Sequence, residues 1–288
     1  MLPTLPLPVR LLEVGHCRHP EWVTERGGRW GARCFPSISA LIRHPSRGAL
    51  LFDTGYAQHF LTATRRFPER LFRWVTPPAL PAAHTLTVQL QAHGLQAAQI
   101  GLVVASHLHA DHIAGLRDLP RADCLLLRAE FRTQLSRGRF GGLRRGFLRA
   151  LLPDDFGQRA RMVDDCPRIT LDPRLAPFAE AFDVLGDGSV LAIALPGHSP
   201  GQLGLLLRAA PDGQLLLLCA DAAWSTRAWM QQRPPSWLAR PLMHDWPAYL
   251  RTLAALGRIG HAAGERIAIV PSHCPQALAA WRSRTVVA

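Results

Sequence analysis

Hydrophobic residues gather in short runs that end at glycine, proline or charged residues, the pattern typical of buried β-strands. In the first half of the chain these runs predict strands at residues 9–14, 38–42, 49–52, 100–105 and 125–127. In the second half they predict strands at residues 189–195, 203–207, 215–219 and 266–270. Residues 210–213 read Ala-Pro-Asp-Gly, a turn that favours a hairpin between two of these strands.

Helical spacing of hydrophobic residues occurs between the strands. It predicts one helix at about residues 58–73 and another at 87–93, the second ended by Gly94. Residues 129–152 are also helix-like and rich in arginine, and we expect a basic helical insertion at about 129–185. A lid over a site and a solvated insertion are equally consistent with its length.

Strand-rich stretches in both halves flank the helical ones, and no repeat of fixed period relates them. This order favours an α/β fold in which two sheets pack together and helices cover the outside. A chain of 288 residues has the length of one large domain, so we expect a single domain over residues 1–288.

Composition excludes several classes of protein. Hydrophobic residues make up 48% and charged residues 19%, which fits neither a disordered nor a low-complexity chain. The six cysteines occur singly, so we expect reduced thiols rather than a disulfide scaffold. No apolar run reaches the length of a membrane span, and the N-terminal stretch lacks the charges of a signal peptide, so a cytoplasmic protein is expected.

The net charge of +12 comes from 33 basic and 21 acidic residues, and every basic residue is arginine. The chain contains neither lysine nor asparagine, which indicates a bias in nucleotide composition. A surface that binds nucleic acid more often mixes lysine with arginine and concentrates both on one element. A nucleic-acid partner is therefore not expected from the charge.

Four potential metal ligands, His107, His109, Asp111 and His112, directly follow the expected strand at residues 100–105. Alternation in an extended segment directs His107 and His109 to one side, and a tighter turn lets Asp111 and His112 face a neighbouring point. Two adjacent metal ions thus become possible. Imidazoles with a carboxylate and no thiolate suit a borderline ion such as zinc and leave coordination positions for water and substrate. The pattern favours a catalytic metal site.

Three more candidate ligands each follow an expected strand, where a rigid sheet can hold a side chain accurately. They are His198, Asp221 and His273. We predict that Asp221 bridges two ions. One ion is expected to bind His107, His109 and His198, and the other Asp111, His112 and His273. The other histidines are assigned to the surface or to support of the ligands: His16, His19, His44, His59, His84, His93, His244 and His261.

Together these motifs are similar to those of the metallo-β-lactamase superfamily. The His-x-His-x-Asp-His run, the Gly-His-Ser-Pro-Gly turn at His198, the strand-end Asp221 and the Ser-His pair at His273 occur in the family's order. The resemblance covers about residues 9–280 and implies a four-layer αββα sandwich with two divalent metals, by default zinc, at one edge. It also implies that Asp53, in an Asp-Thr-Gly motif, supports the site by hydrogen bonding a ligand imidazole.

Asp221 stands where true β-lactamases of the superfamily carry cysteine or serine, so antibiotic hydrolysis is disfavoured. It resembles the bridging ligand of dinuclear branches that include N-acyl-homoserine lactonases, glyoxalase II and RNase Z. The Asp-Thr-Gly motif and the interval from His198 to Asp221 are similar to those of the lactonases. The resemblance therefore implies hydrolysis of an ester-like carbonyl, most simply in a small-molecule lactone, with Asp111 as the proton shuttle.

Lactonases of this type carry a tyrosine three residues after the bridging aspartate, and this chain has Trp224 there. The indole N–H of Trp224 can donate a hydrogen bond to a substrate carbonyl, and the hydroxyl of Tyr56 is an alternative donor. Packing at the start of a helix is the competing role for Tyr56. Tryptophans in expected loops are candidates for the wall of an acyl pocket: Trp22, Trp30, Trp224, Trp229 and Trp237.

Two other functions stay open. One is phosphodiester cleavage of the ribonuclease type, because the same ligands can serve an in-line displacement. The other is a non-catalytic relative that retains the metals and binds a small signal. No sequence feature bears on the oligomeric state.

Overall fold

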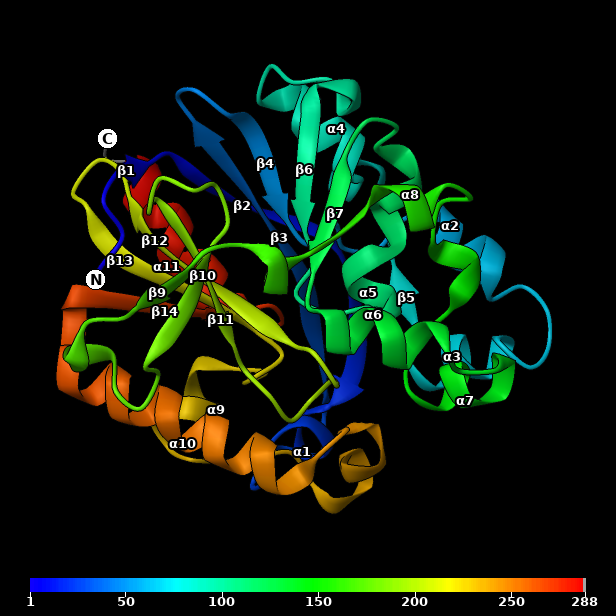
Figure 1. Cartoon of the computed structure of the whole chain (residues 1–288). Coiled ribbons are helices and arrows are strands. Elements are labelled where there is room, and N and C mark those ends of the chain that lie inside the picture. The colour runs from blue at the N-terminus through cyan, green and yellow to red at the C-terminus, as the bar shows by residue number, and fades with distance from the viewer. Residues whose placement is uncertain (287–288) are drawn as a thin grey trace.

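The computed structural model describes residues 1–286, which form two β-sheets packed face to face with helices on both outer faces (Figure 1). The strands are β1 (Pro6–Leu7), β2 (Val9–Pro20), β3 (Ala32–His44), β4 (Gly48–Phe52), β5 (Pro78–Ala79), β6 (Ile100–Val104), β7 (Asp123–Leu126), β8 (Ala160–Met162), β9 (Arg168–Thr170), β10 (Glu180–Asp183), β11 (Val190–Ala194), β12 (Leu203–Ala209), β13 (Gln214–Ala220) and β14 (Ile267–Pro271). The α-helices are α1 (Glu21–Thr24), α2 (Gln58–Ala63), α3 (Arg70–Val75), α4 (Leu86–Ala92), α5 (Ala110–Ile113), α6 (Arg128–Leu135), α7 (Arg139–Arg144), α8 (Phe156–Arg159), α9 (Thr226–Met230), α10 (Trp246–Ala263) and α11 (Pro275–Val286).

The first sheet has the strand order β5-β2-β3-β4-β6-β7-β8, and the second has β14-β13-β12-β11-β10-β9 with β1 beside β12. In the first sheet β4, β6, β7 and β8 run parallel, and in the second β13 and β14 do. Neighbouring parallel strands end at the same edge of a sheet. The segments that follow β4 and β6 therefore lie close together, and so do those that follow β13 and β14.

Three apolar clusters separate four layers. Leu12, Leu51 and Phe60 belong to the cluster between the first sheet and its helices. Leu205 belongs to the cluster between the two sheets, and its neighbour Leu206 belongs to the one beneath α9 and α10. This alternation along one strand buries both faces of the sheet. The order helix, sheet, sheet, helix is the predicted αββα sandwich, and Figure 1 shows α10 and α9 along the outside of the second sheet.

The helix expected at residues 58–73 is wrong as a single element. It is two short helices, α2 and α3, with Pro68 in the segment between them. Proline has no N–H and clashes with the preceding helical turn, so it interrupts the helical pattern on either side. The second expected helix, at residues 87–93, is confirmed as α4, and Gly94 ends it with a φ of 71°.

The basic insertion expected at about residues 129–185 is helical only in its first part, in α6, α7 and α8. The later part was expected to be helical and instead forms strands. β8 extends the first sheet beside β7, and β9 and β10 extend the second beside β11. Edge strands of the two sheets offer unpaired N–H and C=O groups, and pairing with them decides this conformation over local helical spacing.

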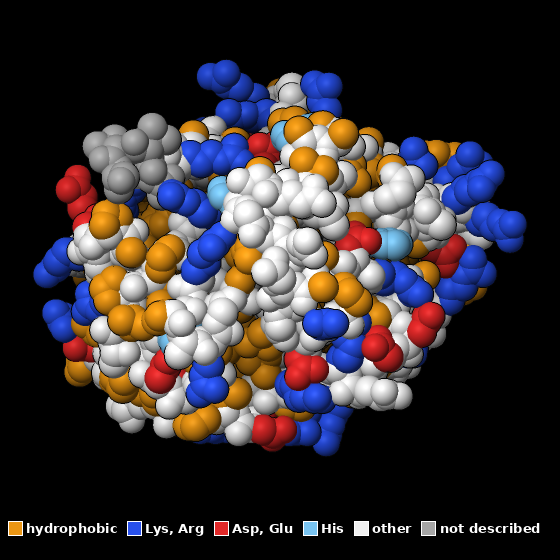
Figure 2. Space-filling view, turned by 90° about the horizontal axis from the view of Figure 1, so that it is seen from above, with side chains coloured by type: hydrophobic (Ala, Val, Ile, Leu, Met, Phe, Trp, Pro, Cys, Tyr) orange, Lys and Arg blue, Asp and Glu red, His pale blue; other side chains and the backbone are white. Residues whose placement is uncertain are grey.

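All six cysteines are free thiols, and four of them are buried: Cys17, Cys124, Cys219 and Cys274. Over residues 1–286, no helix combines the length and the apolar character that crossing a bilayer requires. On the face that Figure 2 presents, arginine side chains spread over the surface with aspartates and glutamates among them. Many charges of the described residues are paired, as in Arg117–Asp154 and Arg128–Asp165.

Candidate metal centre

The seven predicted ligands meet where strands of both sheets end. The first four follow β6, and Asp111 and His112 lie in the short helix α5. His198 follows β11, Asp221 follows β13 and His273 follows β14. The strand ladders fix each strand end, so side chains far apart in sequence reach one place.

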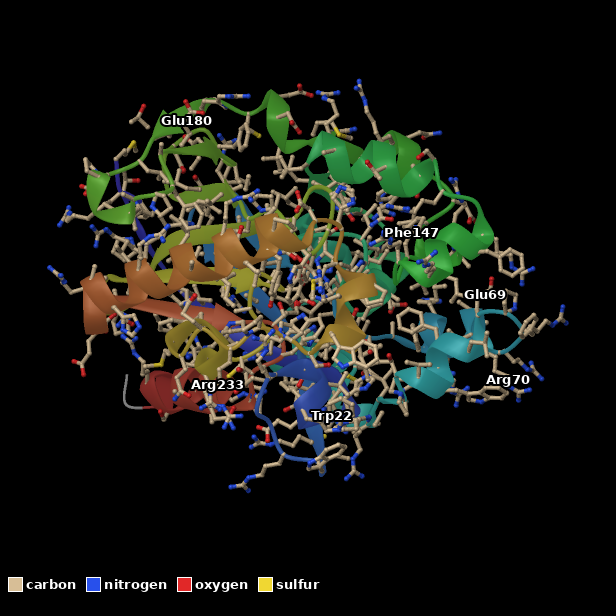
Figure 3. The ribbon with its side chains drawn as sticks, turned by 90° about the horizontal axis from the view of Figure 1, so that it is seen from below. Trp22, Glu69, Arg70, Phe147, Glu180 and Arg233 are labelled. Carbon is tan, nitrogen blue, oxygen red and sulfur yellow. The ribbon has the colours of Figure 1, made fainter. Side chains whose placement is uncertain are left out.

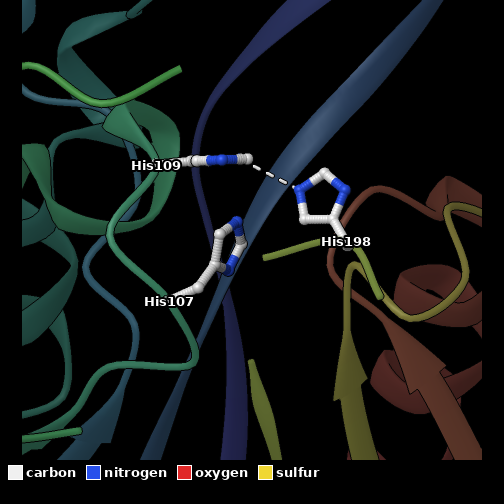
Figure 4. Close-up of side chains that lie close together, drawn as sticks. All are labelled: His107, His109 and His198. Atoms are coloured by element: carbon white, nitrogen blue, oxygen red, sulfur yellow. Dashed lines mark hydrogen bonds between the residues drawn. The ribbon is translucent and has the colours of Figure 1, made fainter. Parts of the chain in front are cut away.

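The first cluster consists of His107, His109 and His198, whose ring nitrogens converge from two loops (Figure 4). His198 Nε2 lies 2.9 Å from His109 Nδ1, and the His107 and His109 ring centroids are 4.4 Å apart. A second cluster consists of Asp111, His112 and His273, in which His273 Nε2 lies 3.4 Å from Asp111 Oδ2. These are the two groups that the sequence pattern predicts.

Asp221 lies between the two clusters and directs one oxygen to each. Its Oδ2 is 3.3 Å from His198 Nε2. Its Oδ1 is 3.3 Å from His112 Nε2 and 3.1 Å from His273 Nε2. One carboxylate oxygen toward each cluster is the geometry that a bridging ligand needs.

Several buried polar atoms of the site have no hydrogen-bond partner. They are His107 Nε2, His112 Nε2 and Asp221 Oδ1. Buried polar atoms of folded proteins are nearly always paired, and an orphaned one is costly. Imidazole nitrogens and carboxylate oxygens are ligands that zinc and similar divalent ions accept. The residues present therefore fit metal ions on either side of Asp221.

Asp53 supports the cluster of Asp111, His112 and His273 by holding the His112 ring. Its Oδ2 lies 2.8 Å from His112 Nδ1, which orients the ring so that Nε2 faces the site. The same carboxylate accepts hydrogen bonds from the backbone N–H and the hydroxyl of Ser106, at 2.7 and 2.8 Å. Asp53 has a φ of 58°, and strain of this kind is retained where the surrounding contacts over-determine it.

Glu130, on α6, ties the two ligand loops together and was not among the predicted site residues. Its side chain is fully buried. Oε1 accepts from the backbone N–H of Leu108 and from Gln134, at 2.9 and 3.0 Å. Oε2 accepts from the Ser199 hydroxyl and from the Gly201 N–H. Leu108 separates two ligands and Ser199 follows a third, so one carboxylate sets the spacing of the loops.

Burial and charge together set the protonation of the ligands. Burial lowers the pKa of His107 and His198 well below the ordinary value of imidazole, so both rings are neutral and have a free lone pair. Burial acts in the same direction on His112, but the carboxylates of Asp221, Asp53 and Asp111 outweigh it and raise its pKa. For Asp221, burial favours the acid, yet the surrounding imidazoles hold its pKa well below the usual range.

A cavity of about 630 Å³ opens onto the clusters, and Asp111, His109 and His198 are part of its floor. Its wall is mainly apolar and comes from α3, α7, β3 and the 3₁₀ helix η7 (Trp237–Leu242). Among the wall residues are Phe35, Phe72, Val75, Phe140, Leu143 and Leu238. Such a volume suits a small organic molecule with an apolar part.

The cavity wall includes part of the basic segment whose role the sequence left open. In Figure 3, Glu69 and Arg70 mark the start of α3, and Phe147 lies just beyond α7. Arg139 of α7 donates to both carboxylate oxygens of Glu69, at 2.6 and 2.8 Å, and so links the two helices. Gly146, after α7, has a φ of 72° and leaves only 3.2 Å for a Cβ beside the His109 ring.

Trp224 is the single member of the predicted tryptophan set among the lining residues. Its indole N–H donates to Asp221 Oδ2 at 2.9 Å, and its ring meets His198 edge-on. Tyr56 does not line the cavity: it is buried in the core with its ring against Phe60. Burial raises the pKa of Tyr56 well above its usual value, which keeps the phenol protonated.

Two of the remaining histidines depart from the simple surface assignment. His19 lines the cavity, and nothing in its local sequence indicates this. His44 is buried and lies 2.8 Å from an oxygen of Asp187, away from the metal ligands.

Comparison with known proteins agrees with this geometry. A family model described as the metallo-beta-lactamase superfamily matches residues 32–273. Among curated proteins, the N-acyl homoserine lactonase AttM of Rhizobium radiobacter is 31% identical over 204 residues, which cover 69% of either chain.

Two solved structures have the same fold. AiiA of B. thuringiensis, a mutant with N-decanoyl-L-homoserine bound at the active site, superposes with a TM-score of 0.70 at 16% identity and covers 98% of this chain and 97% of its own. AidC, described as a dizinc quorum-quenching lactonase, has a TM-score of 0.61 at 14% identity and covers 94% of this chain and 90% of its own.

Proposed function

The chain belongs to the metallo-β-lactamase superfamily of metal-dependent hydrolases, and we propose that it opens the ring of a lactone, with N-acyl-homoserine lactones as the substrate class. The proposal rests on one observation: a single cavity combines candidate metal ligands with an apolar wall. The floor is a pair of histidine and carboxylate clusters bridged by Asp221, and the wall is apolar. The AttM relatives supply the substrate class.

The wall and the floor suit the two halves of such a substrate. A lactone ring with its ester carbonyl is small and polar and fits the floor, while an acyl chain gains from contact with apolar side chains. Phe72 and Leu143 offer such contact. Leaving water out of this part of the cavity also strengthens the electrostatic interactions at the floor.

Two divalent cations, bound on either side of Asp221, would polarise the carbonyl and lower the pKa of the attacking water. His107, His109 and His198 would hold one of them, and His112, His273 and Asp111 the other. The neutral imidazoles of His107 and His198 suit this task because their lone pairs stay free. Asp53 and Glu130 hold the ligand loops in place.

Asp111 is the candidate proton carrier. It lies on the cavity floor, and its carboxylate is more exposed than that of Asp221. An accessible carboxylate can accept a proton from the attacking water and transfer it to the leaving alkoxide oxygen, which becomes the hydroxyl of the product acid.

Trp224 has a different task from the one that its alignment with the lactonase tyrosine implies. Its only N–H points to Asp221 Oδ2, so the indole orients the bridging carboxylate. An indole N–H is a donor only, and one proton serves one good acceptor at a time. We therefore assign Trp224 to positioning Asp221 and leave the carbonyl to the groups on the cavity floor.

The test is a hydrolysis assay with the zinc-loaded full chain, in which the release of acid measures the reaction. The substrates are N-acyl-homoserine lactones with short and long acyl chains, an aryl ester and bis(p-nitrophenyl) phosphate. We expect turnover of the lactones, higher kcat/KM for longer chains, and at least two metal ions per chain by elemental analysis.

The same panel separates the alternative functions. Turnover of the phosphodiester without lactone or ester turnover would overturn the proposal in favour of a nuclease-type activity. Two bound metals with lactone binding by calorimetry but no hydrolysis would instead indicate a non-catalytic receptor. Asp118→Asn, a change at a surface carboxylate that pairs with His59, serves as the control for handling and metal loading.

A further inference from the structure

Another group of potential ligands lies outside the catalytic cavity. Glu13 and His16 belong to β2, and His84 belongs to the 3₁₀ helix η1 (Ala82–His84). The three side chains offer one carboxylate oxygen and two imidazole nitrogens within 4.8 Å of one another. They share no residue with the clusters around Asp221.

An irregularity of β2 brings the first two side chains together. In a regular strand, side chains three positions apart point to opposite faces of the sheet. Between Glu13 and His16 the register against β3 shifts, because three steps along β2 match only two along β3, from Ile38 to Pro36. This β-bulge inserts one residue and returns His16 to the face of Glu13.

Gly15 makes the bulge possible. Its φ of 76° lies in the left-handed region, where a side chain is strained. A Cβ at this position would also meet Tyr56 Cβ at 3.0 Å and the carbonyl oxygen of Ala79 at 3.1 Å. β5 pairs with β2 at His16 through Ala79, so the chain that leads to His84 passes beside the bulge.

The donor atoms have the spacing of a metal site. Glu13 Oε1 lies 3.8 Å from His16 Nδ1 and 3.5 Å from His84 Nδ1. Ligand atoms about 2.0–2.1 Å from a tetrahedral zinc ion lie ~3.3 Å from each other, so both of these separations differ from that spacing by only a few tenths of an ångström. The two imidazole rings meet at an angle of 70° with centroids 6.1 Å apart, so they are not stacked on each other.

The nitrogen and oxygen atoms that would bind the ion are not used up by hydrogen bonds. His16 Nδ1 and His84 Nδ1 are buried atoms without a hydrogen-bond partner. Arg282 of α11 lies 3.7 Å from Glu13 Oε2, the other oxygen of the carboxylate, and so leaves Oε1 turned toward the two imidazoles. Two orphaned imidazole nitrogens beside one carboxylate oxygen match the set of two histidines and one carboxylate that binds zinc together with water.

We propose that Glu13, His16 and His84 form an additional binding site for a divalent cation of the zinc class, separate from the catalytic clusters. Its ion joins the bulge of β2 to η1 and thereby clamps the segment that leads from β5 into α4. The site has a structural role, because it lies outside the catalytic cavity and shares none of its residues.

The experiment measures zinc per chain by elemental analysis after equilibration of the full protein at a series of buffered free zinc concentrations. The variants are Glu13→Gln, which keeps the shape of the side chain, and His84→Ala. The matched control is His59→Ala, which removes a histidine that pairs with Asp118. We expect wild type and control to bind one zinc equivalent more than either variant, with equal hydrolase activity in all four proteins.

A second measurement keeps the test decisive if a variant is less stable. Zinc binds the folded state, so added zinc raises Tm, and the rise for wild type should exceed that for Glu13→Gln. Equal zinc content and equal Tm response in wild type and Glu13→Gln would overturn the proposal. The outcome is independent of the proposed function, because activity reports only on the catalytic clusters.

Discussion

The metal centre and the cavity wall are built in opposite ways. The candidate ligands around Asp221 are buried, apart from the partly exposed Asp111, and follow strands whose ladders continue across whole sheets. The wall comes mainly from the short elements α3, α7 and η7, and its Val75 and Phe140 are about two-thirds exposed. Strand ends in a sheet are held by many hydrogen bonds, whereas a helix of six residues satisfies few of its own. The proposed chemistry is thus on rigid supports, and the proposed selection of substrate is on adjustable ones.

The supporting contacts show the same contrast. At the centre, Asp53 and Glu130 each accept several hydrogen bonds from the ligand loops. In the wall, the main polar link between α3 and α7 is the Arg139–Glu69 pair at the surface. Changes at the centre should therefore affect metal content and activity together, and changes in the wall should affect substrate preference alone.

The largest effect is expected from Asp221→Asn. The amide presents an N–H₂ group to one of the two clusters that the carboxylate now joins, so the shared ligand is lost. We expect kcat/KM to fall by more than about 100-fold, beyond the ~10- to 100-fold typical of changes that act through a ligand's partner. Zinc content should fall with it. Normal zinc content and activity, with Asp118→Asn as control, would show that Asp221 is not a bridge.

Glu130→Gln tests whether the loops need their common anchor. All four groups that face the Glu130 carboxylate are donors, so an amide places its own N–H₂ group against two of them. We expect kcat/KM to fall by about 10- to 100-fold, with weaker zinc retention during dialysis. Glu180→Gln, at an exposed carboxylate of β10, is the matched control. A lower Tm with unchanged zinc affinity and activity would limit Glu130 to a folding role.

Trp224→Phe separates orientation of Asp221 from chemistry at the substrate. It keeps an aromatic ring and removes the one N–H that reaches Asp221 Oδ2. A hydrogen bond to a charged group contributes ~1.5 kcal/mol or more, so we expect an approximately 10-fold lower kcat with little change in KM. The matched control is Trp237→Phe, at an exposed tryptophan outside the cavity. An effect on KM alone would indicate direct contact with substrate.

The smallest effect is expected from the wall variant Leu238→Ser. Leu238 lines the cavity from η7, outside the segments that carry the candidate ligands, so zinc content should stay unchanged. Part of the ~1.5–3 kcal/mol that a fully buried leucine contributes should be lost for long acyl chains, which corresponds to about 3- to 10-fold in kcat/KM. Short-chain lactones should be nearly unaffected. Leu250→Ser on α10 is the control. Equal losses for short and long chains would place the acyl chain elsewhere.

The sequence predicted correctly which side chains meet where a motif and a strand end coincide. The candidate ligands at His107–His112 lie together in the chain, and His198, Asp221 and His273 each follow a hydrophobic run, so local pattern was enough to bring them to one place. The helix at 58–73 failed because one proline outweighs a helical pattern. The prediction of a helical insertion was wrong at β8, β9 and β10, because these segments lie beside the edges of the sheets and pair with them.

The sequence by itself determined that two sheets pack together under outer helices and that each candidate ligand follows a strand, because these follow from hydrophobic periodicity and from residues a few positions apart. Only the tertiary structure decided that Glu130 anchors two loops and that Trp224 turns its N–H to Asp221. It also decided that a bulge at Gly15 brings Glu13, His16 and His84 together. Each of these depends on contacts between segments distant in the chain, and a local sequence pattern does not show which distant segment will pack beside it.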